Sequence, residues 1–317
     1  MNSSSSQKIH SPTFNEIMSA VNQVREICDK YETIPKSEIY NETWMLRLTL
    51  ALMKEIDIEQ LKRKGDHISE VCRAVRSGWI SEGGLKPVFK REHTTWTDAI
   101  LGRICFAKNG RNVEIKGSDL LEDDEYKGVI VIEAKMASEL SRRVKDSQGY
   151  DQAARNIACL SRLIVASNVK DVPLEQVHFY VFAPKSKIEE WNTKKKKANG
   201  KKKECNPEAM IKDAVKTIEQ QQEVSSEHCN SREFYFSSDE ERDSGIITID
   251  AITEKAKTIV GNSEVISWES ILKLIKCHLY AHKDSSRLLT GYYEDIVNYY
   301  KITKKIYGII DDEIQNI

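Results

Sequence analysis

The 317-residue sequence lacks the features that would assign it to a class at once. Its formal net charge is only −1, so no overall positive field indicates a nucleic-acid partner, and any such surface must be local. Its apolar runs are too short to span a membrane, and the polar start is not a signal peptide. We therefore expect a cytoplasmic protein with no membrane partner, in which residues 1–11 are disordered.

The chain also lacks a disulfide pattern. Its seven cysteines are odd in number, scattered, and mostly set within apolar segments, which favours reduced core thiols. A hydrophobic content of 40% and a charged content of 31% are typical of an ordinary soluble protein. The length allows a sizeable core in one large domain or two modest ones.

The strongest positive signal is the apolar run at residues 129–132, Val-Ile-Val-Ile. Four consecutive β-branched residues predict a strand buried on both faces, as in the middle of an open α/β sheet. Glu133, Ala134 and Lys135 follow where this strand should emerge, and open α/β sheets place ligand sites at such strand ends. Alternation sends Glu133 and Lys135 to one face and Ala134 to the other.

The surrounding patterns predict an α/β fold with a mixed central sheet flanked by helices. Helices are expected at 13–31, 42–55, 66–79, 150–165 and 207–222, and strands at 85–90, 97–107, 112–121, 129–136, 178–183 and 245–250. Ser267 is expected to cap a further helix. We divide the chain into a disordered start (1–11), an α/β domain (12–190), a Lys-rich loop (191–205) and a mainly helical extension packed on the core (206–317).

The pattern Glu-x-Lys occurs three times, beginning at Glu114, Glu125 and Glu133. Only Glu133 ends a buried apolar run and is followed by a helix and another strand. Carboxylates at such a strand end can hold Mg²⁺, which binds through oxygens, activates a bound water and neutralises phosphate charge. A nearby lysine can stabilise the developing oxyanion or orient the attacking water. The second acid is either Asp98, at a strand start, or Asp119, and we prefer Asp98.

These segments resemble the PD-(D/E)XK nuclease superfamily. The resemblance rests on residues 97–100 (Thr-Asp-Ala-Ile), 132–135 (Ile-Glu-Ala-Lys), a helix with Gln152, and 179–182 (Phe-Tyr-Val-Phe), within residues 42–184. Trp96-Thr97-Asp98 and residues 150–156 are similar to a bacterial subgroup that supplies no activity. Thr97 replaces the proline of the motif, and the separation of Asp98 from Glu133 requires an inserted hairpin.

The resemblance implies a restriction-endonuclease-like core of one helix, three antiparallel strands, a second helix and a parallel strand. It implies a Mg²⁺ (or Mn²⁺) site in which Asp98, Glu133 and the Ala134 carbonyl are ligands and Lys135 is the catalytic lysine. An additional acid often joins such sites, and we prefer Glu82 over Glu42. Gln152 and Arg155 would fall on the first turn of the following helix, where they could contact a phosphate.

The expected function is therefore metal-dependent hydrolysis of nucleic acid, with DNA favoured over RNA. The alternative is a catalytically inactive scaffold with the same core, acting as a nucleic-acid- or protein-binding module. A homodimer is a candidate assembly.

Overall fold

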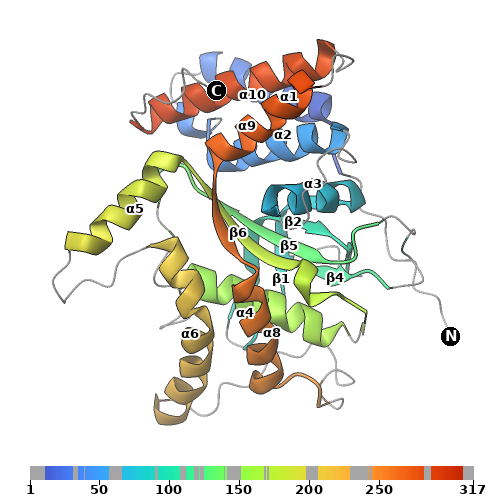
Figure 1. The fold of residues 1–317 in the computed structure, drawn as a ribbon, viewed down its shortest axis with the longest axis vertical. Helices are drawn as coiled ribbons and strands as arrows, with labels where there is room; N and C mark the ends of the chain where they lie inside the picture. Colours follow the sequence, from blue (N-terminus) through green and yellow to red (C-terminus); the bar gives the residue numbers. More distant parts are fainter. Residues whose placement is uncertain are drawn as a thin grey trace.

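In the computed structural model, the central feature is a five-stranded sheet with the order β1-β2-β5-β6-β7 (Figure 1). The strands are β1 (Trp79–Leu85), β2 (Thr95–Gly102), β5 (Val129–Ala134), β6 (Val177–Ala183) and β7 (Glu264–Ser267). Neighbours in the first half, β1-β2-β5, are antiparallel, and those in the second half, β5-β6-β7, are parallel. The predicted α/β class with a mixed sheet is confirmed. The structure describes residues 11–30, 35–38, 40–56, 66–89, 92–107, 112–117, 121, 125–138, 140, 151–167, 169, 171–197, 206–228, 242, 245–281 and 287–309.

Strand β5 occupies the middle of the sheet because its sequence is apolar on both faces. All six of its residues are buried. Ile130 and Ile132 belong to one hydrophobic cluster, and Val129 and Val131 belong to the other. Gly128 permits the close approach to β6, because a Cβ there would lie 2.0 Å from the carbonyl oxygen of Gln176. The predicted central strand is confirmed.

Five helices share the cluster that contains Ile130 and Ile132, and they gather on one face of the sheet (Figure 1). They are α1 (Phe14–Lys30), α2 (Glu42–Glu55), α3 (His67–Ser77), α9 (Trp268–Ala281) and α10 (Arg287–Ile306). Helix α2 has the predicted bounds, and Asn41 caps it by accepting a hydrogen bond from the Trp44 N–H at 3.1 Å. Ser267 caps α9 through the Ser270 N–H at 3.0 Å, as predicted.

The opposite face is covered by α4 (Gln152–Ala166), α6 (Pro207–His228) and α8 (Ile249–Gly261), which share the cluster of Val129 and Val131. Helix α5 (Lys185–Lys197) follows β6 and extends away from the sheet (Figure 1). The loop predicted at 191–205 was wrong in its first part, because residues 191–197 belong to α5, and residues 198–205 lie outside the described residues. Two short 3-10 turns, η1 (Lys36–Glu38) and η3 (Leu174–Gln176), complete the helical elements of the described chain.

Three strand predictions were wrong in their bounds. The predicted strand at 85–90 overlaps β1 only at Leu85, since β1 begins at Trp79, directly after α3 stops at Ser77 and Gly78 takes a φ of +139°. The predicted strand at 97–107 is divided at Gly102, whose φ is +98°. Its second part, β3 (Ile104–Phe106), pairs with β4 (Val113–Ile115), the observed part of the predicted 112–121 strand, in a separate two-stranded sheet. This pair is the hairpin expected between Asp98 and Glu133.

The C-terminal segment differs from its prediction in two places. The predicted strand at 245–250 does not form, because Thr248 caps α8 by accepting a hydrogen bond from the Ala251 N–H at 3.1 Å. Strand β7 was not predicted, and it makes the C-terminal segment part of the central sheet as well as of both hydrophobic clusters. None of the helices in the described part of the chain has the length and hydrophobicity needed to cross a membrane.

Candidate active site

The pairing of β2 with β5 ends at Ala99 and Ile132, and Asp98 lies just beyond it. One Asp98 carboxylate oxygen, Oδ2, accepts a hydrogen bond from the Ala134 N–H at 2.7 Å. On the other side of β2, Ser81 pairs with Ala99 and Gly83 pairs with Thr97, so the ladder skips the intervening position at Asp98. The Asp98 carboxylate therefore accepts the hydrogen bond from the Ala134 N–H in place of a main-chain carbonyl of β2, at the point where β2 and β5 separate.

The Glu133 carboxylate is buried at the end of β5, with 3% of the residue exposed. Its Oε1 accepts a hydrogen bond from the Lys135 ammonium at 2.7 Å and another from the Gln152 amide. Its Oε2 accepts one from the Asn156 amide at 3.3 Å. Three donors thus hold this carboxylate in one orientation, and two of them come from α4.

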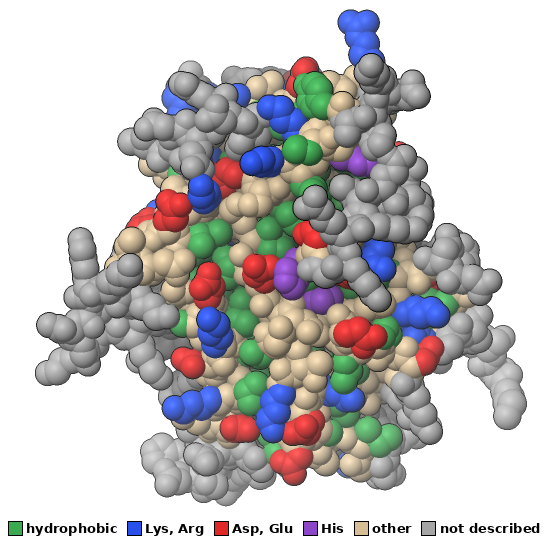
Figure 2. Space-filling view, viewed as in Figure 1, with side chains coloured by type: hydrophobic (Ala, Val, Ile, Leu, Met, Phe, Trp, Pro, Cys, Tyr) green, Lys and Arg blue, Asp and Glu red, His purple; other side chains and the backbone are tan. Residues whose placement is uncertain are grey.

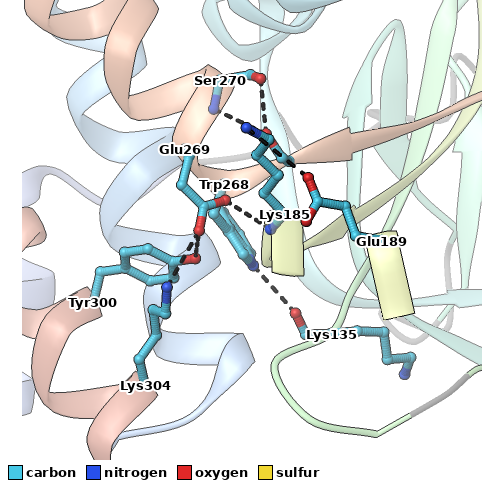
Figure 3. A network of polar contacts seen from close by, with 9 residues as sticks. Lys135, Lys185, Glu189, Trp268, Glu269, Ser270, Tyr300 and Lys304 are labelled. Carbon is cyan, nitrogen blue, oxygen red and sulfur yellow. Dashed lines mark hydrogen bonds and ion pairs between the residues drawn. The ribbon is translucent and has the colours of Figure 1, made fainter. Parts of the chain in front are cut away.

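Lys135 is held at its main chain as well as at its side chain. Its N–H donates to the Phe182 carbonyl of β6 at 2.7 Å. Its own carbonyl accepts a hydrogen bond from the indole Nε1 of Trp268, in α9, at 3.2 Å (Figure 3). The lysine is therefore fixed at the junction of β5, β6 and the C-terminal segment.

The electrostatics of this cluster are those of an excess of buried acid. Burial and the neighbouring Glu133 carboxylate raise the pKa of Asp98 to about 7. Burial also raises the pKa of Glu133, although the Lys135 ammonium and the Asn156 amide act in the opposite direction. Burial alone would lower the pKa of Lys135, but the Glu133 and Asp98 carboxylates raise it above its ordinary value. Lys135 is thus an ammonium ion at neutral pH.

The other two Glu-x-Lys sequences form separate ion pairs away from this cluster. Glu114 pairs with Lys86 at 3.3 Å, and Glu125 pairs with Lys116 at 2.8 Å. Neither glutamate is paired with the lysine of its own triplet in these contacts. Glu133 contacts its own lysine, Lys135, at 2.7 Å, and this is the triplet that the sequence singled out.

The two remaining acid candidates are distinguished by their contacts. Glu82, at a φ of 55°, pairs with Arg47 at 3.3 Å, and its side chain is 64% exposed. Glu42, the first residue of α2, acts electrostatically on Asp98, Glu133 and Lys135 together. This electrostatic effect favours Glu42 over Glu82 as the additional acid. Asp119 lies outside the described residues.

Helix α4 supplies two side-chain contacts to Glu133 that were not predicted. Gln152, which was expected to contact a phosphate, donates a hydrogen bond to the Glu133 carboxylate. Arg155 donates instead to the His93 carbonyl at 2.6 Å, ahead of β2. Asn156 was not predicted as a site residue, although it lies one helical turn after Gln152 and so on the same helix face. That spacing is the signal that could have found it.

The atoms that this cluster offers to a metal ion are carboxylate oxygens, which suit a hard divalent cation. The carboxylates of Asp98, Glu133 and Glu42 interact electrostatically around a single ammonium, that of Lys135. Their negative charges outnumber the positive charge, and a bound cation would neutralise the excess. Among the described residues, no group of three or more His, Cys, Asp and Glu side chains is arranged to hold a metal ion. The predicted ligand set of Asp98, Glu133, Glu82 and the Ala134 carbonyl contains three such side chains and is not gathered into one group, because Glu82 pairs with Arg47 instead.

Comparison of the chain with protein-family models, with curated proteins and with solved structures returned no match.

Proposed function

We propose that this protein is a metal-dependent phosphodiesterase with a restriction-endonuclease-like core, and that it hydrolyses nucleic acid, preferably DNA. The observation that carries the proposal is the convergence of Asp98, Glu133 and Lys135 at the end of one buried strand. The order of elements supports it. Helix α3, the antiparallel strands β1, β2 and β5, helix α4 and the parallel strand β6 follow one another as in that superfamily.

Asp98, Glu133 and the Ala134 carbonyl would hold Mg²⁺ or Mn²⁺ in this proposal. When bound, such an ion lowers the pKa of a coordinated water and neutralises charge on the scissile phosphate. Oxygen ligands with one main-chain carbonyl suit these cations.

The roles of the protein side chains follow from their contacts. Lys135 carries a positive charge beside Glu133, so it would stabilise the developing negative charge on the phosphate rather than remove a proton. Gln152 and Asn156 orient the Glu133 carboxylate from α4. Glu42 adds negative charge and thereby strengthens the preference of the site for a cation.

The direct test is incubation of the purified protein with DNA in Mg²⁺, beside the Glu133→Ala and Lys135→Ala variants. We expect cleavage by the unaltered protein and a loss of about 100-fold or more in each variant, as for removal of one charge-stabilising group. The matched control is Glu114→Ala, which removes the glutamate of another Glu-x-Lys triplet and its ion pair with Lys86. Equal cleavage by all four proteins would contradict the proposal.

A catalytically inactive scaffold is the second candidate, and one observation favours it. Both oxygens of Glu133 already accept hydrogen bonds from the chain's own side chains. A binding module would keep this network as a structural lock and would not exchange it for a metal ion. Absence of any Mg²⁺- or Mn²⁺-dependent rise in melting temperature would support this candidate, because an ion that binds the native state must raise it.

A further inference from the structure

The C-terminal segment contributes a buried tryptophan to the proposed site. Trp268 is the first residue of α9, directly after β7, and it is 0% exposed. Its ring lies edge-on to Phe182 with centroids 5.3 Å apart. Its Nε1–H donates to the Lys135 carbonyl at 3.2 Å, across 133 residues of sequence (Figure 3).

The contacts of Trp268 and Phe182 converge on the backbone of one residue. The Phe182 carbonyl accepts from the Lys135 N–H at 2.7 Å, and Trp268 donates to the Lys135 carbonyl. Both peptide groups that flank the Lys135 Cα are thus held. Since the backbone sets the direction of the Cα–Cβ bond, this arrangement fixes the point from which the Lys135 side chain reaches Glu133, 2.7 Å from its ammonium.

The neighbouring residue, Glu269, anchors the same segment. Its Oε2 accepts from the Lys185 N–H at 2.9 Å, where α5 begins directly after β6. Its Oε1 accepts from the Tyr300 hydroxyl at 2.7 Å and from the Lys304 ammonium at 3.5 Å, both in α10 (Figure 3). Glu269 is 6% exposed and Lys304 is 1% exposed. Helices α9 and α10 are therefore tied to the ends of the two strands that border the site.

We propose that Trp268 is a positioning residue for Lys135, and that the C-terminal segment from β7 onward completes the site by holding the carboxyl ends of β5 and β6. The catalytic consequence rests on the proposed function, because it assumes that Lys135 takes part in hydrolysis. The structural consequence is independent of it. Without the indole N–H, the buried Lys135 carbonyl loses its hydrogen bond from Trp268. Local unfolding of the segment after β5 then becomes more frequent.

The test compares Trp268→Phe with Trp79→Phe. Trp79 is the matched control, because it is also a buried tryptophan in the same cluster, while its Nε1 has no hydrogen-bond partner among the described residues. Hydrogen exchange of the 133–138 amides, read at Lys135, is measured in both variants and in the unaltered protein. We expect exchange about tenfold faster in Trp268→Phe and unchanged in Trp79→Phe, the difference that loss of one hydrogen bond produces.

DNA cleavage in Mg²⁺ is the second readout, in which Trp268→Phe should lower kcat about tenfold with KM unchanged. Equal exchange at Lys135 in the two variants would overturn the inference. If the unaltered protein does not cleave DNA, the proposed function fails, and the exchange comparison alone decides whether Trp268 positions Lys135. If Trp268→Phe does not fold, a benzothienylalanine at position 268 keeps the two-ring shape without the N–H and gives the same comparison.

Discussion

Asp98 is the residue whose environment most constrains the chemistry of the site. Its carboxylate is buried against Glu133, so its pKa stands at about 7 in the folded protein instead of the ordinary 3.8. Between these two pH values the folded protein binds the proton more tightly than the unfolded chain does. The free energy of unfolding therefore falls as the pH rises from 3.8 to about 7, because in this range Asp98 ionises in the unfolded chain but keeps its proton in the folded protein.

Asp98→Asn should remove this dependence. Without metal at pH 8, we expect the variant to be more stable than the unaltered protein by about 1–3 kcal/mol, because a buried charge is lost. The advantage should disappear at pH 4, where Asp98 holds its proton in the folded protein. Melting temperatures at the two pH values measure it. An advantage of the same size at both values would show that Asp98 does not ionise against Glu133.

Residues whose role depends on local sequence could be predicted, and residues whose role depends on tertiary contact could not. Glu133 and Lys135 follow a buried apolar run, and both lie where the pattern indicates. Asn156 donates to Glu133, and Glu42 acts on the same carboxylate electrostatically, because α4 and α2 pack beside the end of β5. The helical spacing of Asn156 from Gln152 indicates a shared helix face, but it does not indicate which strand end that face meets. Arg155 lies on the predicted helix but turns towards the His93 carbonyl.

At the scale of elements, strong periodic patterns were placed well and weak strands were not. Helix α2 and strand β6 have strong hydrophobic patterns, and their bounds were predicted to within one residue. Strand β1 contains the polar and glycine residues 81–84, and its strand conformation depends on pairing with β2. Strand β7 has only four residues, and its pairing with β6 brings together segments far apart in sequence.

The contact between α9 and α10 depends on a buried ion pair. Glu269 and Lys304 have side chains that are 7% and 1% exposed, and the Nζ–Oε1 distance is 3.5 Å. Lys304→Met should destabilise the protein by about 3 kcal/mol or more, because it leaves a buried carboxylate without its cation. The double variant Glu269→Gln, Lys304→Met should recover much of this loss. Urea unfolding measures both, and equal stability of single and double variants would contradict the pairing.

At the scale of the whole molecule, the C-terminal segment belongs to the fold and is not an appendage. It supplies β7 to the sheet and buried residues to both hydrophobic clusters. A chain truncated after residue 205 would expose the apolar faces of β6 on both sides of the sheet. We expect this fragment to lack a cooperative melting transition and a near-ultraviolet circular dichroism signal. A cooperative transition would show that the preceding part folds alone.

The charge of the whole molecule makes a cation necessary for the proposed function. The net charge is −1, and in Figure 2 acidic and basic side chains are interspersed over the visible face. The acid cluster around Asp98 and Glu133 would repel a phosphate backbone. A divalent ion neutralises the excess negative charge there, which explains how a nearly neutral protein could accept a polyanion at this place.

The central claim is that Asp98 and Glu133 together bind a divalent cation beside Lys135. Titration of Mn²⁺ followed by electron paramagnetic resonance measures this without any substrate, in the unaltered protein and in Glu133→Gln, Asp98→Asn and Glu114→Gln. We predict that the first two substitutions weaken binding about tenfold or more through loss of a ligand charge, and that Glu114→Gln leaves it unchanged. Equal Mn²⁺ affinity in all four proteins would contradict the account.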